Sequence, residues 1–152
     1  MASSWFSRAD DSRDFVILQE GDYTIQLGAP REERRGNYDA VIFPFQTNGN
    51  SNIVPHEISI LYPTDENDKT GIDRSRRILA EFYRCFGVDP KSSTAEPSDF
   101  YHRYGKVHIG RNGNGYMTVD RFYKSETLET IHHNAQPQPQ NVYQMAETAL
   151  DY

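Results

Sequence analysis

Cysteine is almost absent from this sequence, which contains a single one, Cys85, among its 152 residues. One cysteine cannot form an internal disulfide or supply a cysteine-based zinc site. No apolar run approaches the roughly 18–20 residues that a membrane span requires. The polar, acidic beginning of the chain lacks the apolar segment of a secretory signal. We therefore expect a cytoplasmic protein that makes no contact with a membrane.

The common enzyme motifs are also missing. The glycine cluster at 110–115 does not have the spacing of a dinucleotide fingerprint, and no Gly-Lys-Ser/Thr sequence occurs. The five histidines form no spaced pair on an expected helix, and His132 and His133 are simply adjacent. Cys85 falls on the apolar stripe of an expected helix, as a core residue does. We expect no catalytic residue, no metal site and no cofactor, so the protein should act by binding.

Charge is unevenly distributed along the chain. The net charge is −6, yet residues 100–124 contain five cations and one anion, which gives +4. The same stretch contains six aromatic residues. Aromatic rings can stack on bases while neighbouring cations meet phosphates, so this stretch predicts a surface for single-stranded nucleic acid. Some of the rings are expected to belong to the core instead.

Alternating apolar and polar residues predict five short strands. The loop at 29–37 contains three arginines, and two Asn-Gly pairs at 112–115 predict a hairpin turn. Pro44 favours an edge position or a bulge, because proline cannot donate to a strand ladder. The expected strands are 22–28, 38–46, 57–62, 105–110 and 116–123.

One helix is expected at 73–86, with Asp73 as its N-cap and Gly87 just after its end. Apolar residues at three- and four-residue spacings form a single stripe along it. These residues are Ile78, Leu79, Phe82, Cys85 and Phe86.

The element order β-β-β-α-β-β predicts an all-β domain with one helix, arranged as a five-stranded OB-fold-like barrel. An α+β sandwich with the same order is the alternative. We expect an N-terminal arm at 1–20, the OB-like domain at 21–124 and a flexible acidic tail at 125–152. In the arm, Trp5-Phe6 is expected to dock on the domain.

The tail contains a low-complexity segment at 134–141 and an acidic, partly apolar tip at 142–152. We expect the tail either to occupy the cationic groove when it is empty, to dock replication or repair proteins, or to have no partner. Homo-oligomers are compatible with the sequence.

An OB barrel binds ligands on the face of its second and third strands, between the loops that join strands one to two and four to five. Both expected loops carry arginine, Arg31, Arg34 and Arg35 in the first and Arg111 in the second. Cations and aromatics near this face are the candidate site for single-stranded DNA. The candidates are Arg34, Arg35, Tyr38, Phe43, Tyr101, Arg103, Tyr104, Lys106, Arg111, Tyr116 and Arg121.

Three segments of residues 5–124 resemble a family of small phage-encoded single-stranded-DNA-binding proteins. They are Trp5-Phe6 with the EGDYTI sequence at 20–25, the helix at 77–87 with its LAEFYRCFGV sequence, and the hairpin at 105–119. The resemblance implies an OB-like fold and a role in phage DNA replication or recombination, in the host bacterial cytoplasm. It implies no catalytic residue.

The alternative is an acidic phage protein that binds and inhibits a host protein, as inhibitors of bacterial defence do, without binding nucleic acid. Negative charge, exposed tyrosines and Asn/Gly-rich loops also suit a protein interface. The two hypotheses differ in one structural expectation. If the cations of 31–35 and 100–124 meet on one surface, DNA binding is favoured, and if they are scattered, protein binding is favoured.

Overall fold

A computed structural model describes residues 15–133. The sequence-predicted arm at 1–20 and tail at 125–152 therefore lie mostly outside the described residues, including Trp5-Phe6 and the tip at 142–152. The described elements, in chain order, are β1 (Val16–Ile17), β2 (Gly21–Leu27), β3 (Arg31–Arg35), β4 (Tyr38–Gln46), β5 (Ile53–Val54), β6 (Glu57–Pro63), α1 (Lys69–Cys85), the 3₁₀ helix η2 (Pro97–Phe100), β7 (Tyr104–Arg111) and β8 (Met117–Phe122).

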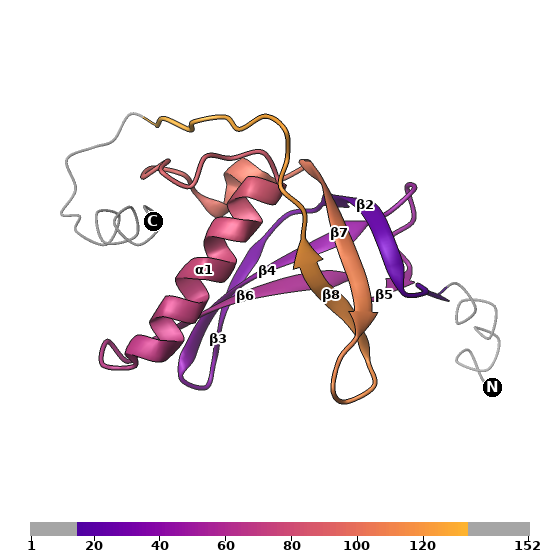
Figure 1. Cartoon of the computed structure of the whole chain (residues 1–152), viewed down its shortest axis with the longest axis horizontal. Helices are drawn as coiled ribbons and strands as arrows, with labels where there is room; N and C mark the ends of the chain where they lie inside the picture. The colour runs from indigo at the N-terminus through magenta and orange to yellow at the C-terminus, as the bar shows by residue number, and fades with distance from the viewer. Residues whose placement is uncertain (1–14, 134–152) are drawn as a thin grey trace, which may run out of the picture.

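The strands form one main sheet whose order is β3-β4-β2-β7-β8, with β6 also paired to β4 (Figure 1). All pairings in this sheet are antiparallel, whereas β1 and β5 form a separate parallel pair. The prediction of a mainly β domain with one helix is therefore confirmed. A closed five-stranded barrel is not confirmed, because within residues 15–133 β6 and β8 do not pair.

The segment at 29–37, expected to be a loop, contains strand β3. Its five residues pair with β4 from Arg31 opposite Ile42 to Arg35 opposite Tyr38. All five are exposed and charged, so no apolar alternation marked them as a strand. Charged side chains of this kind protect an edge strand against unwanted pairing.

Pro44 lies inside β4, which has neighbours on both sides. β3 begins opposite Ile42, and β2 pairs with β4 only at Phe45 and Gln46. Pro44 therefore occupies the gap between these two neighbours, where its missing N–H leaves no partner unsatisfied. Pro44 is therefore not on an edge strand, but it lies where no neighbouring strand needs its backbone N–H.

Helix α1 begins four residues before the predicted start. The Asp68 side chain accepts a hydrogen bond from the Gly71 N–H at 3.0 Å and so caps the helix in place of Asp73. The C-terminal prediction is confirmed, since Gly87 follows the helix with φ of +79°. Most of the apolar stripe is also confirmed, but Ile78 is 38% exposed and lies outside the core.

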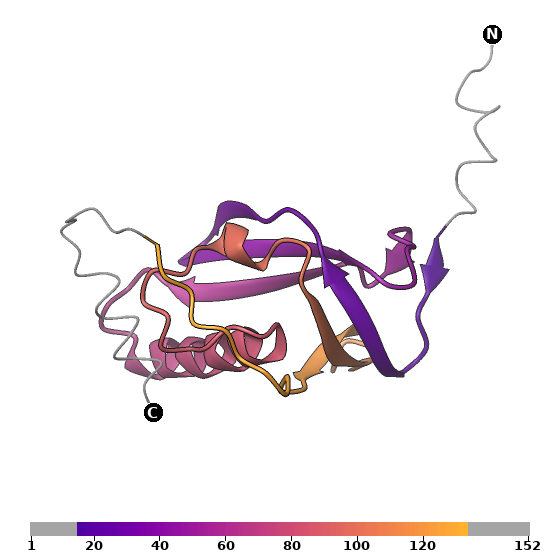
Figure 2. The same ribbon diagram turned by 90° about the horizontal axis from the view of Figure 1, so that it is seen from above.

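Helix α1 packs against β6 as a layer beneath the sheet and also contacts β8 (Figure 2). The Phe82 ring centroid lies 4.8 Å from that of Phe43 on β4 and 5.8 Å from that of Phe122 on β8. Phe86 and Phe100 extend the same cluster. Each such ring pair contributes about 0.5–1.5 kcal/mol beyond its buried area. Side-chain packing thus takes the place of the β6–β8 pairing that would close a barrel.

A C-terminal strap, residues 124–133, continues the domain beyond the expected boundary at 124. It runs across the C-terminal end of α1 and the loop at 87–96 (Figures 1 and 2). The Glu129 N–H donates to the Gly87 carbonyl at 2.8 Å, and the Ile131 N–H donates to Ser92 Oγ at 2.9 Å. Ile131 is 8% exposed and belongs to the core. The part of the expected tail from 125 to 133 is therefore held by hydrogen bonds and burial.

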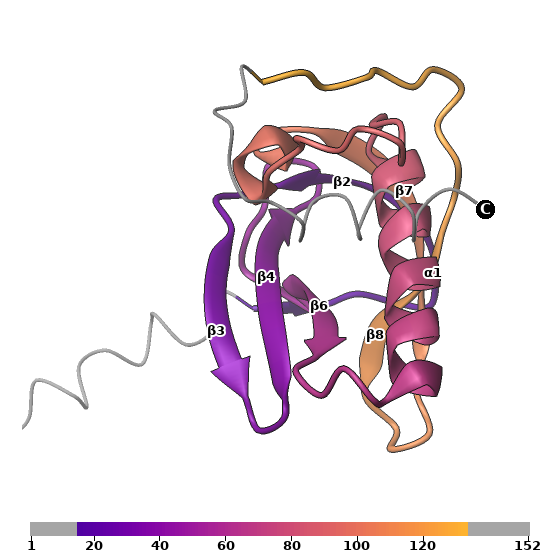
Figure 3. The same cartoon turned by 90° about the vertical axis from the view of Figure 1, so that its left-hand side faces the viewer.

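Two hairpins, β3–β4 and β7–β8, project on the same side of the domain (Figures 1 and 3). Their tips are the turn at Gly36-Asn37 and the loop at 112–116. These are the two loops that the OB hypothesis places beside the binding face. In the strand order, β2 lies between the two hairpins.

Candidate nucleic-acid interface

One face of the β2-β7-β8 part of the sheet points away from the core, and we call it the outer face. On β7, Tyr104 and Lys106 are exposed and His108 is half-buried. Val107 and Ile109, which alternate with them, are fully buried. Thr24 and Asp22 of β2 lie opposite Lys106 and His108. Directly opposed residues of antiparallel strands share a face, so these side chains form one surface.

A β-bulge in β8 brings two more side chains to the outer face. Ile109 pairs with Val119, whereas the preceding residue His108 pairs with Arg121, so Asp120 is an extra residue in β8. The insertion reverses the alternation after Val119. As a result Phe122 points into the core, and Arg121 and Tyr123 point outward.

Tyr123 lies at the centre of the outer face. Lys106 Nζ is 5.3 Å and Arg121 Cζ is 5.0 Å from its ring centroid, within cation–π range. Its hydroxyl donates to Asp22 Oδ1 at 2.8 Å, and this hydrogen bond raises the pKa of Tyr123. The ring is therefore held by β2, β7 and β8 together.

His108 and Asp120 form a second polar pair on this face, with 2.7 Å between Nδ1 and Oδ1. The hydrogen bond to Asp120 raises the pKa of His108. The central cluster thus contains two permanent cations, Lys106 and Arg121, two carboxylates, Asp22 and Asp120, and one imidazole. Protonation of His108 changes the formal charge of this cluster from zero to +1.

Exposed tyrosines extend the outer face at both ends of β7. Tyr104 is 65% exposed at the start of the strand, and Tyr116 is 72% exposed in the loop that joins β7 to β8. Tyr101 is 45% exposed and stacks on His102, with ring centroids 3.7 Å apart. His102 adjoins the outer face, because its carbonyl accepts from Gln26 Nε2 of β2 at 3.1 Å.

Two of the predicted cations have structural roles. Arg103 donates to the Asp99 carbonyl at 2.8 Å and forms an ion pair with Glu129 of the strap at 2.7 Å. Arg111 donates to the Gly115 carbonyl at 2.7 Å and so closes the β7–β8 loop, although its side chain remains exposed. Arg103 is thereby withdrawn from the outer face. Arg111 lies opposite Met117, which packs against the core, so the Arg111 side chain leaves the strand on the other face of the hairpin.

The remaining predicted residues lie elsewhere. Arg34 pairs with Asp39 at 2.9 Å and Arg35 pairs with Glu33 at 2.8 Å, both on the β3–β4 hairpin. Tyr38, on the same hairpin, is 38% exposed. Phe43 is 3% exposed inside the core, where it cannot stack on a base. The cations of 31–35 are therefore engaged with carboxylates and not with the outer-face cluster around Tyr123.

The sequence-predicted site did not include Tyr123, His108, Asp22 or Asp120. Tyr123 was missed because strict alternation from Tyr116 would turn it toward the core, and no residue in the sequence indicates the bulge.

Cys85 is buried with Sγ 3.3 Å from the Lys106 carbonyl, and burial raises its thiol pKa to about 12. This fits its expected place in the core. Within the described residues, one His/carboxylate group could hold a metal ion, namely Glu96, Asp99 and His133, and it is not on the outer face.

No helix among the described residues is long and apolar enough to span a membrane.

The outer face brings together four of the predicted residues, Tyr104, Lys106, Tyr116 and Arg121, and Tyr101 precedes them beside His102. Neither the scan against protein-family models nor the search of curated proteins finds a match to this chain.

Proposed function

We propose that this protein binds single-stranded DNA on the outer face, without sequence preference, in a phage replication or recombination system. One observation carries the proposal. Exposed tyrosines and the cations Lys106 and Arg121 occupy one continuous sheet surface, and among the described residues neither cation forms a salt bridge. Such a surface offers both stacking platforms and phosphate contacts, and it requires no catalytic group.

In this mechanism the bases stack on Tyr104 and Tyr116, and on the open side of the Tyr101 ring. Each stacked base contributes about 1–3 kcal/mol. Lys106 and Arg121 neutralise phosphates and release counterions. From Tyr104 to Arg111 the strand rises about 24 Å at roughly 3.4 Å per residue. The surface is thus long enough for a few nucleotides, in agreement with the about 4–16 nucleotides that one OB fold covers.

We also propose that the domain is an open relative of the OB barrel. With β2, β4, β6, β7 and β8 taken as the five OB strands, the first strand pairs with both the second and the fourth. The second pairs with the third, and the fourth with the fifth. The helix lies between the third and fourth strands, as in the predicted order. In this scheme β3 is an insertion in the first loop.

The test is fluorescence anisotropy with labelled oligo-dT of about 30–40 nucleotides at low and high salt, with duplex DNA of equal length as competitor. We expect salt-sensitive binding that duplex does not displace. Tyr104→Ala should weaken it by roughly tenfold, as loss of one stacked base predicts. Tyr38→Ala is the matched control, because Tyr38 is exposed on the other hairpin. Equal losses in the two variants would contradict the outer face as the site.

Host-protein binding is the second candidate, and one observation favours it. The cations of the β3–β4 hairpin are paired with carboxylates. In a chain of net charge −6, the cationic surface is therefore small. If the full chain binds neither single-stranded DNA nor RNA at low salt, pull-down from host extract with outer-face variants as controls becomes the decisive experiment.

A further inference from the structure

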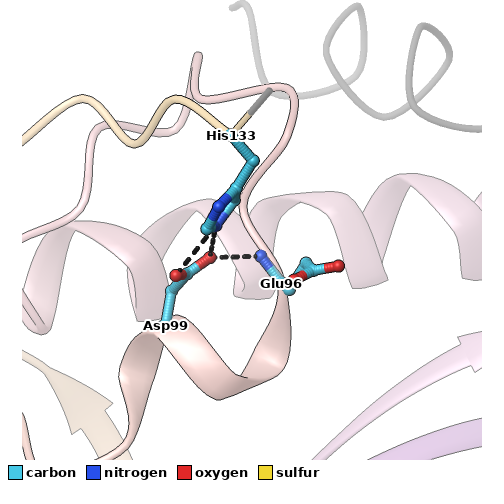
Figure 4. Close-up of side chains that lie close together, drawn as sticks. All are labelled: Glu96, Asp99 and His133. Atoms are coloured by element: carbon cyan, nitrogen blue, oxygen red, sulfur yellow. Dashed lines mark hydrogen bonds and ion pairs between the residues drawn. The ribbon is translucent and has the colours of Figure 1, made fainter. Parts of the chain in front are cut away.

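Three potential metal ligands converge where the strap meets the helix η2. Glu96 is the N-cap of η2 and Asp99 belongs to it, while His133 arrives from the end of the strap, 34 residues after Asp99. Figure 4 shows the His133 ring directed at the Asp99 carboxylate, whereas the Glu96 carboxylate points away from them. One ligand atom from each residue lies within 4.8 Å of the others. The His133 Nε2 atom is 3.0 Å and 2.8 Å from the two carboxylate oxygens of Asp99.

The two closest ligands are held in place by the surrounding backbone. Asp99 Oδ2 accepts from the Glu96 N–H at 2.7 Å, and only 16% of the Asp99 side chain is exposed. The His133 N–H donates to Thr94 Oγ1 at 3.0 Å, and Thr94 Oγ1 donates to the Ile131 carbonyl at 3.3 Å. Groups that orient ligands in this way raise metal affinity.

We propose that Glu96, Asp99 and His133 form a binding site for one divalent transition-metal cation of the zinc class. An imidazole with two carboxylates suits zinc, cobalt or nickel better than magnesium or calcium, which prefer all-oxygen ligands. The two carboxylates match the charge of a divalent cation. Arg103, the nearby cation that donates to the Asp99 carbonyl, is already neutralised by Glu129.

The geometry requires one local adjustment. Ligand atoms about 2.0–2.1 Å from a tetrahedral ion are roughly 3.4 Å from one another. The Asp99–His133 distances of 2.8 Å and 3.0 Å are slightly shorter than this value. The exposed Glu96 carboxylate, which forms a capping box with Asp99, would have to turn inward. Three protein ligands leave the fourth position to water, as in open zinc sites. The cation would join η2 to the strap and add a link where now a single ion pair exists.

The test uses the full 152-residue chain, stripped of metal, at pH 8 in a non-coordinating buffer. Zn²⁺ is titrated by calorimetry and Co²⁺ by visible absorption. We expect one ion per chain, a tetrahedral Co²⁺ spectrum and a rise in the unfolding temperature on addition of Zn²⁺. Mg²⁺ should cause no rise.

His133→Ala and Glu96→Gln should each lower Zn²⁺ affinity by about tenfold or more. His132→Ala is the matched control, because this adjacent histidine is outside the cluster, and it should bind Zn²⁺ as the parent does. Each variant is compared with itself before and after addition of Zn²⁺, so a change in stability caused by loss of the His133–Asp99 ion pair does not affect the comparison. Absence of binding at millimolar Zn²⁺, or an equal loss in His132→Ala, would overturn the proposal.

Discussion

The ring of Phe86, the C-cap residue of α1, lies directly over Gly105 of β7, so closely that a Cβ on residue 105 would stand 2.6 Å from the ring. Cys85 Sγ would be 2.9 Å away on the same side. Gly105 is therefore the position at which the helix approaches the sheet. The contact links the helix to the strand that carries Tyr104 and Lys106.

Gly105→Ala should destabilise the protein by about 1–3 kcal/mol, because the added methyl group overpacks a closed core. Gly113→Ala is the matched control, since nothing lies within 4 Å of a Cβ there. Urea denaturation of both variants checks the prediction. Similar midpoints for Gly105→Ala and the parent would show that the helix can move away from the strand without loss.

Arg121→Gln should reduce the salt dependence of single-stranded DNA binding. Each phosphate contact contributes about 0.7 to the slope of log K against log salt on a single strand, so the slope should fall by about that amount. Arg34→Gln is the control, because Arg34 is already paired with Asp39. The slopes are measured by anisotropy at four or more salt concentrations. An unchanged slope in Arg121→Gln would remove this residue from the interface.

The His108–Asp120 pair should make stability depend on pH. Asp120 raises the pKa of His108 above its ordinary value of 6.5 in the folded state. The stabilising contribution is therefore fully present below pH 6.5 and is lost as pH rises through the raised pKa. The difference in unfolding temperature between the parent and His108→Gln should accordingly be largest near pH 6 and disappear at higher pH.

Asp120→Asn provides the control for this pH dependence. It should return the His108 pKa, measured by NMR titration, toward 6.5, since the hydrogen bond to the carboxylate is the main cause of the shift. If the difference in unfolding temperature between the parent and His108→Gln grew with pH instead, protonated His108 would not be the form that stabilises the fold.

Ile131→Ala should destabilise the protein by about 2–5 kcal/mol, the usual range for an isoleucine truncated in a core. Leu128→Ala, in the same strap but 36% exposed, should change stability much less. Chemical denaturation measures both. Equal and small effects would show that the strap is held by its hydrogen bonds alone, without help from the buried side chain.

Sequence patterns predicted the features that depend on local chemistry. The strands β2, β4, β6 and β7, the helix end at Gly87 and the Asn-Gly hairpin were all predicted close to their observed positions. Asp68 and Asp73 are both good N-caps, so the choice between them depended on the tertiary position of the loop before α1. Strand β3 was missed because Arg31–Arg35 has no apolar face at all.

The candidate site was predicted less completely, for two physical reasons. Aromatic residues serve both core and surface, so nothing local distinguished Phe43 from Tyr104. The Asp120 bulge then reversed the alternation, which placed Tyr123 outward, and a bulge depends on the partner strand. The Glu96–Asp99–His133 cluster was equally hidden, since its members come from segments that only the folded chain brings together.

The aromatic filling between β6 and β8 also has a mechanical meaning. Elsewhere in the sheet, neighbouring strands are joined by backbone hydrogen bonds, and sliding one past the other would break several at once. Along the line occupied by Phe82, Phe86 and Phe122, ring contacts join the helical segment to β8, and they have no such fixed register. The half that contains β4 and β6 is thus joined to the half that contains β7 and β8 in two ways, by backbone hydrogen bonds through β2 and by packed rings.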